Sequence, residues 1–136
     1  MLSQIKLVSK INRLMDRDEM RKAFLELSEF YNFYKDSWAA YHLGYLYENG
    51  QGVKKDFKKA ISFYSVSAKM GFDSALLNLG ICYARGKGVK RSSAKAVALY
   101  KKAANQGNRN AQYNLGLYYD EGRGVKKNPK LAFKWY

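Results

Sequence analysis

The sequence predicts an all-α, right-handed superhelical solenoid made of helix-turn-helix repeats. The main observation is a period of 36 residues, seen in the pairs Leu43-Gly44, Leu79-Gly80 and Leu115-Gly116. Periods of 20–50 residues mark architectures in which each unit buries its apolar face only by stacking on its neighbours. The chain also has one proline among its 136 residues, as expected of a mostly helical protein.

Each repeat is expected to begin with a helix, over residues 38–48, 74–84 and 110–120. In the first of these, Ala39, Leu43 and Tyr47 recur every four residues and therefore share one face. Gly44 lies in the middle of that face, and its counterparts Gly80 and Gly116 do the same. A helical glycine costs about 1 kcal/mol relative to alanine. Its recurrence predicts a close approach of another helix, where a Cβ would not fit.

A glycine turn and a second helix complete each repeat. The segment Gly50-Gln51-Gly52 ends the first helix, and its first glycine suits a left-handed cap. Asp56 is the predicted N-cap of the second helix, and Ser92 and Asn128 occupy the equivalent positions. Pro129 follows at the first helical position, where proline is tolerated.

The ends of the chain depart from the repeat. Residues 1–36 contain two helical apolar stripes and fit the pattern loosely, so we expect a degenerate repeat that forms an N-terminal helical cap. The array occupies residues 37–136 in about three units, and the last one is incomplete, because Tyr136 corresponds to Tyr64 and Tyr100 within the second helix. We expect this end to expose apolar residues such as Phe133 and Trp135, and the chain to be the opening portion of a longer array or an array that another chain completes.

The repeated residues resemble the Sel-1-like repeat, a relative of the tetratricopeptide repeat. The second unit carries the pattern in full: Ala75, Leu79-Gly80, Tyr83, Gly86-Lys87-Gly88-Val89, Lys95-Ala96, Tyr100, Ala103-Ala104 and Gly107. The resemblance implies an α/α solenoid that acts as an adaptor and binds proteins or peptides on its concave face. A cysteine-rich branch of the family has been linked to penicillin binding, but this chain lacks the paired cysteines of that branch.

The candidate partner-binding surface lies on the side of each first helix opposite the core. Helical geometry places an apolar stripe there, with polar residues at its edge. Exposed tyrosine and leucine side chains favour a peptide or helix as the partner, although these side chains also fit a role in packing between adjacent repeats. The stripe comprises Tyr41, Tyr45, Leu77, Ile81, Tyr113 and Leu117, with Glu48, Arg85 and Asp120 as the polar edge.

The chain is strongly basic, with a formal net charge of +14. Nearly all of the excess lies in the array, where pairs of cations recur at the same two positions of each repeat. Stacking would align them into a ridge that favours an acidic partner or nucleic acid; the alternative is a solvated loop that keeps the array soluble. This basic ridge comprises Lys54, Lys55, Lys90, Arg91, Lys126 and Lys127.

Catalysis, metals and cofactors find no support in the sequence. His42 is the only histidine and corresponds to Asn78 and Asn114, which predicts a polar slot rather than a metal ligand. Cys82, the single cysteine, corresponds to Leu46 and Tyr118 and is expected to pack in the core. No glycine loop has the phosphate-binding spacing, so we expect neither catalytic residues nor a cofactor. Without a secretory signal or an apolar membrane span, a cytoplasmic protein is expected.

We therefore predict a non-enzymatic scaffold or adaptor that binds a protein or peptide partner, acidic in character, on the concave face of the solenoid. The alternative is an electrostatic binder of nucleic acid or another anionic partner through the basic ridge.

Overall fold

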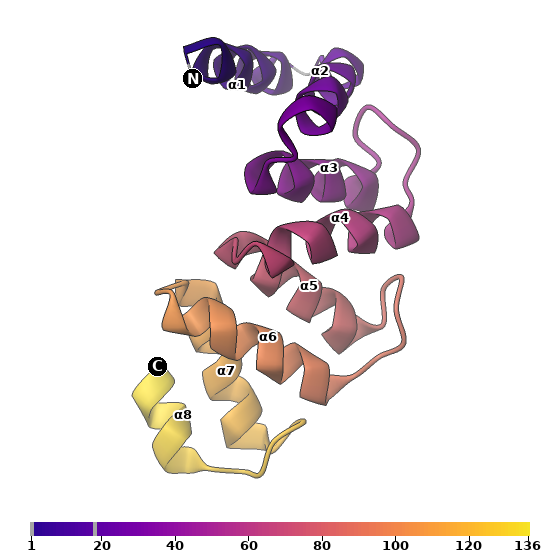
Figure 1. Cartoon of the computed structure of the whole chain (residues 1–136). Helices are drawn as coiled ribbons and strands as arrows, with labels where there is room; N and C mark the ends of the chain where they lie inside the picture. The colour runs from indigo at the N-terminus through magenta and orange to yellow at the C-terminus, as the bar shows by residue number, and fades with distance from the viewer. Residues whose placement is uncertain (1, 18) are drawn as a thin grey trace.

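The computed structural model describes residues 2–17 and 19–136, which form eight helices and no strand (Figure 1). The first helices of the three repeats are α3, α5 and α7, each followed by its second helix. Each of these first helices begins and ends within one residue of its predicted bounds. The helices are α1 (Leu2–Asp16), α2 (Met20–Tyr34), α3 (Ser37–Asn49), α4 (Phe57–Lys69), α5 (Asp73–Arg85), α6 (Ser93–Asn105), α7 (Arg109–Glu121) and α8 (Pro129–Trp135).

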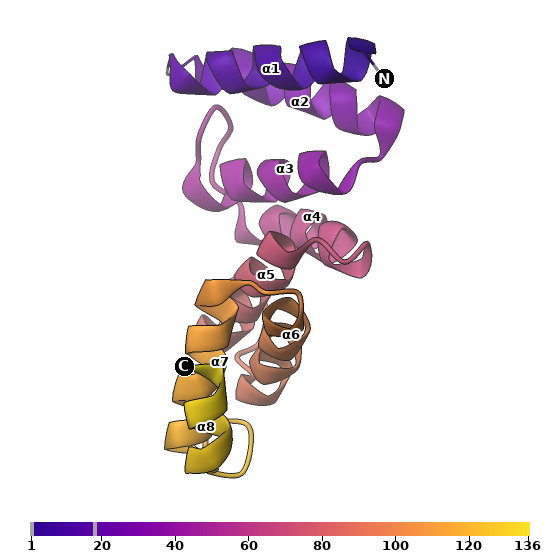
Figure 2. The same ribbon diagram turned by 90° about the vertical axis from the view of Figure 1, so that its left-hand side faces the viewer.

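The helices form an extended stack rather than a bundle around one centre. Figures 1 and 2 show α1 and α2 at one end of the stack and α7 and α8 at the other. Among the described residues, every closely packed pair of helices consists of neighbours in chain order. This arrangement defines an all-α repeat solenoid, in which each unit is supported by the units on either side.

The recurring helix glycine receives a tyrosine ring from the second helix of its own repeat. A Cβ placed on Gly80 would lie 2.8 Å from Cε1 of Tyr100, and one on Gly44 would lie 2.7 Å from Cε1 of Tyr64. Tyr64 and Tyr100 are at most 2% exposed. The predicted close approach is therefore confirmed, and its cause is a buried aromatic ring.

The turns and caps also follow the sequence pattern. Gly86 ends α5 in the left-handed conformation, with φ of 69°, where a side chain would be strained. The Oδ1 of Asp56 accepts a hydrogen bond from the Lys59 backbone N–H at 3.1 Å, which satisfies one of the free donors at the start of α4. Ser92 and Asn128 form the equivalent caps, and Pro129 opens α8 as predicted.

The N-terminal helices share a core with the first repeat. Ile11 of α1, Leu27 and Phe30 of α2 and Leu43 and Leu46 of α3 belong to one cluster of buried side chains. Helices α1 and α2 are thus joined to the array by packing, and their role as an end cap stays a prediction. None of the helices in the described ranges has the length and apolar character required to cross a bilayer.

Candidate functional site

The predicted stripe is only partly exposed. Tyr113 and Tyr45 expose 58% and 39% of their surface, whereas Leu77 exposes 7%. Tyr41 is half-buried, and its ring centroid lies 5.2 Å from that of Phe72, at the boundary with the next repeat. Ile81 and Leu117 are half-buried as well. The stripe therefore serves packing between repeats at some positions and remains accessible at others.

Two of the three polar-edge residues are engaged within their own repeats. The hydroxyl of Tyr64 donates a hydrogen bond to Oε1 of Glu48 at 2.6 Å, and that of Tyr136 donates to Oδ2 of Asp120 at 2.6 Å. In each case the tyrosine is the one that packs on the helix glycine. The hydrogen bond to the Asp120 carboxylate raises the pKa of Tyr136 to about 12. Glu48 and Asp120 thus anchor a tyrosine rather than forming a free acidic edge.

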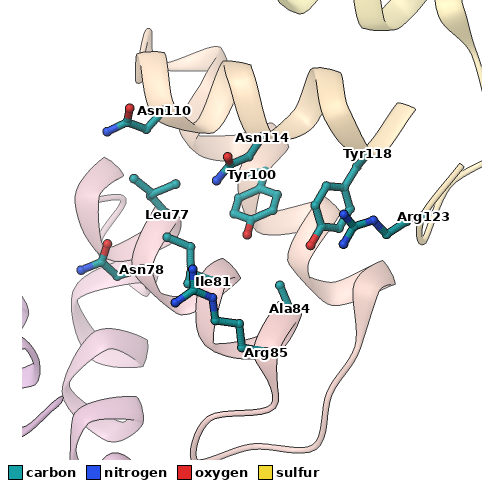
Figure 3. A pocket seen from close by; sticks show the side chains of 10 residues that line it. All are labelled: Leu77, Asn78, Ile81, Ala84, Arg85, Tyr100, Asn110, Asn114, Tyr118 and Arg123. Atoms are coloured by element: carbon teal, nitrogen blue, oxygen red, sulfur yellow. The ribbon is translucent and has the colours of Figure 1, made fainter. Parts of the chain in front are cut away.

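The second repeat opens instead into a cavity of about 560 Å³ between α5 and α7, here called the Tyr100 cavity (Figure 3). It brings together the stripe residues Leu77 and Ile81 and the polar-edge residue Arg85 with side chains from α6, from α7 and from the loop after α7. Its lining is Leu77, Asn78, Ile81, Ala84, Arg85, Tyr100, Asn110, Asn114, Tyr118 and Arg123.

Each polar group of this cavity can donate a hydrogen bond. Arg85 and Arg123 supply two guanidinium groups, and the asparagines supply amides that both donate and accept. Cζ of Arg123 lies 4.8 Å from the ring centroid of Tyr118, and Nε of Arg123 forms an ion pair with Oε2 of Glu121. Burial raises the pKa of Tyr100 above its usual range, and its protonated hydroxyl can donate a hydrogen bond. The cavity is suited to an acceptor.

A second cavity, of about 640 Å³, lies between α7 and α8. Tyr113 and Leu117, two further stripe residues, line it together with Trp135, Tyr136, Gln112 and Arg109. Of the two apolar residues expected to be exposed here, Phe133 is 83% exposed, whereas Trp135 is half-buried against this cavity. The predicted stripe is therefore divided between two cavities, with Tyr41 and Tyr45 lining neither.

The six residues of the basic ridge are all exposed. Each pair lies in the loop between the first and second helix of its repeat, and Figure 1 shows the α3–α4 and α5–α6 loops on the same edge of the stack. Nζ of Lys55 lies 5.1 Å from the ring centroid of Phe57, so one cation of the first pair rests partly on an aromatic side chain.

His42 and Cys82 occupy structural surroundings. His42 lies against Trp38, with ring centroids 4.5 Å apart, and burial lowers its pKa to about 4. Its Nδ1 is buried and has no hydrogen-bond partner among the described residues. Cys82 is 1% exposed, and burial raises the pKa of its thiol to about 11, which makes it a poor nucleophile at neutral pH. Residues 2–17 and 19–136 contain no cluster of three metal-ligating side chains.

The sequence prediction included three of the ten residues that line the Tyr100 cavity and missed the other seven. Asn78 and Asn114 correspond to His42, so the recurring polar slot signalled their surroundings without indicating a cavity. Tyr118 occupies a position expected to be core, and it is indeed only 7% exposed. Arg123 lies within a glycine turn and appeared to be a loop residue. Only the change from Glu48 to Ala84 at equivalent positions pointed to this repeat as different.

Comparisons with known proteins agree on the family. The model of the Sel1 repeat matches residues 39–72, 73–108 and 109–136. A comparison with curated protein sequences found no match.

Solved structures of Sel1 repeat proteins are similar to this chain along most of its length. A Sel1 repeat protein from Oxalobacter formigenes superimposes with a TM-score of 0.88 and 34% identity, covering 93% of this chain and 52% of that one. A protective antigen of uropathogenic Escherichia coli strains, which displays an SLR fold, superimposes with a TM-score of 0.84 and 34% identity. The match covers 86% of this chain and 25% of that one.

A third structure, the cysteine-rich protein B of Helicobacter pylori, gives a TM-score of 0.63 and 28% identity, covering 80% of this chain and 92% of that one. The chain thus spans about half of the Oxalobacter protein and a quarter of the Escherichia coli antigen. With three matched repeats and an eight-helix solenoid in the described residues, the chain belongs to the Sel1 repeat family.

Proposed function

We propose that this chain is a non-enzymatic scaffold that binds a peptide or protein partner on the concave face formed by the first helices of its repeats. Sel1 repeat proteins are generally protein-interaction scaffolds. The observation that carries the proposal is the pair of cavities along α5, α7 and α8, which are lined by four of the predicted stripe residues and by Arg85 of the polar edge. Tyrosine, leucine and arginine line both, and such side chains dominate binding energy in protein interfaces. Cytoplasmic localisation remains part of this proposal.

A comparative pull-down tests the proposal. The full chain and the variant Tyr45→Ala/Ile81→Ala serve as baits, and captured proteins are quantified by mass spectrometry. The control variant is Ser62→Ala/Ala98→Ser, which changes two exposed residues on the second helices α4 and α6. A partner of the first-helix surface should be retained by the control and depleted by the stripe variant. Equal capture by all three baits would contradict the proposed surface.

The second candidate function is electrostatic binding of nucleic acid through the basic ridge, favoured by the exposure of all six cations. A salt titration separates the two functions. Six phosphate contacts would weaken binding about 10³-fold or more between 50 and 200 mM salt. Binding through the tyrosine and leucine side chains should change little over the same range.

A further inference from the structure

The second repeat lacks a carboxylate that the other two repeats share. In the first and third repeats, the tyrosine seated on the helix glycine donates to Glu48 or Asp120 at 2.6 Å. Tyr100 sits on Gly80 in the same way, since a Cβ there would lie 2.8 Å from its ring. The position equivalent to Glu48 and Asp120 is Ala84, whose methyl group accepts no hydrogen bond.

The missing side chain coincides with the Tyr100 cavity. Ala84 and Tyr100 both line it, and Figure 3 shows the hydroxyls of Tyr100 and Tyr118 directed toward the space beside the Ala84 methyl group. Arg85 and Arg123 flank this space on opposite sides in the same view. None of the ten residues that line the cavity is acidic. Tyr118 and Asn114 lie within hydrogen-bonding reach of the Tyr100 hydroxyl, but neither carries the negative charge that Glu48 and Asp120 supply in the other repeats.

Charge selects an anion for this space. Arg85 is exposed and forms no ion pair with a carboxylate in the described ranges 2–17 and 19–136. Arg123 pairs with Glu121 through Nε, and a guanidinium group has two further nitrogens that can donate. Two guanidinium groups and two phenol hydroxyls can together satisfy both oxygens of a carboxylate.

The chain itself indicates which anion fits. At both equivalent positions the acceptor on the tyrosine hydroxyl is a side-chain carboxylate, at the same 2.6 Å separation. The net charge of +14 further favours an acidic partner in solution.

We propose that the Tyr100 cavity binds the side-chain carboxylate of an aspartate or glutamate in a partner peptide, which takes the place that Glu48 and Asp120 occupy in the neighbouring repeats. Tyr100 donates to this carboxylate, and Arg85 and Arg123 neutralise it. The inference rests on the proposed scaffold function and deepens it, because it names the chemistry that the partner must present.

A peptide library provides the test. Nine-residue peptides, amidated at the C-terminus so that only side chains carry carboxylates, are selected on the full chain at fixed ionic strength. Selected peptides should share an acidic position, and replacing that aspartate or glutamate with its amide should weaken binding by about tenfold or more. Absence of binders, or binders without a common acidic position, would overturn the proposal.

Two variants tie the acidic position to the cavity. Ala84→Glu supplies the carboxylate from within, so the selected peptides should bind it at least about tenfold more weakly. Tyr100→Phe keeps the ring that packs on Gly80 but removes the donor, and should erase most of the preference for acid over amide. The matched control is Tyr64→Phe, which removes a hydroxyl that Glu48 already satisfies. It should bind the peptides as the wild type does.

An unchanged preference for acid over amide in Tyr100→Phe would overturn the assignment of the carboxylate to this cavity. The scaffold proposal is tested separately by the stripe variant in the pull-down. If partners depend on Tyr45 and Ile81 but peptides show no acidic position, the scaffold stands and the carboxylate inference fails. If the stripe variant also retains all partners, both fail.

Discussion

Replacing Gly80 with alanine tests how the helices of one repeat are held together. Alanine at a helical position is more favourable than glycine by about 1 kcal/mol. Against this gain, the new Cβ would lie 2.8 Å from Cε1 and 3.0 Å from Cδ1 of Tyr100. Tyr100 is 2% exposed, so its ring cannot move aside without disturbing its neighbours. Overpacking of this kind costs about 1–3 kcal/mol. Since both ring contacts are short, we expect a net loss of about 1–2 kcal/mol.

Urea unfolding measures this change as a shift in midpoint at constant slope. A double-mutant cycle with Tyr100→Ala makes the test sharper, because removing the ring leaves only the gain in helix propensity. In that background Gly80→Ala should stabilise the protein by about 1 kcal/mol, so the sign of the effect reverses. Tyr100→Ala alone should cost about 3–5 kcal/mol.

The control for helix propensity is Ala98→Gly, at an exposed position within α6. It should cost about 1 kcal/mol. If Gly80→Ala instead stabilises the otherwise wild-type chain, then the Tyr100 ring does not require a glycine at this position of α5.

Three further changes test individual contacts. Tyr64→Phe removes the donor to the half-buried Glu48 and should cost about 1–3 kcal/mol in urea unfolding; a loss under about 0.5 kcal/mol would show that the hydrogen bond adds little. Burial lowers the pKa of His42 to about 4. Its imidazole is therefore protonated below about pH 6.5 in the unfolded chain but stays neutral in the folded chain down to about pH 4. Stability should therefore fall by about 3 kcal/mol as the pH drops from about 6.5 to 4, and level off below that. The variant His42→Asn, which has the residue found at the equivalent positions of the other repeats, should lack this fall in stability. If stability depends on pH identically in the wild type and in this variant, His42 is not the titrating group. Ser92→Ala removes the N-cap of α6 and should cost about 1 kcal/mol, whereas Ser93→Ala, one residue further on, should cost much less; equal losses would contradict the cap.

The local features of the fold were predictable because they depend on nearby residues. The caps at Asp56, Ser92 and Asn128 and the left-handed glycine at position 86 form within a few residues of chain, and the sequence pattern located each of them. The helix glycine also predicted a close neighbour, but it did not say that the neighbour is a tyrosine ring of the same repeat.

The cavity was harder to predict because its walls come from two repeats. Helical phase placed Leu77 on the side away from the core of its own helix pair, yet the next repeat covers it to 7% exposure. The same phase placed Tyr118 in the core, although its edge reaches the cavity. A single-helix projection contains no information on what the following helix pair covers, so side chains at repeat boundaries are assigned poorly.

The close packing of helices that are neighbours in chain order also bears on how the protein reaches this structure. Contacts that link segments close together in sequence need little loop closure, and chains dominated by such contacts fold quickly. Each helix pair can close as soon as its own residues are available, without waiting for a distant strand or helix. During synthesis, α3 and α4 can therefore pair on the N-terminal helices before α7 has been made, and the growing array always offers a formed surface on which the next pair can fold.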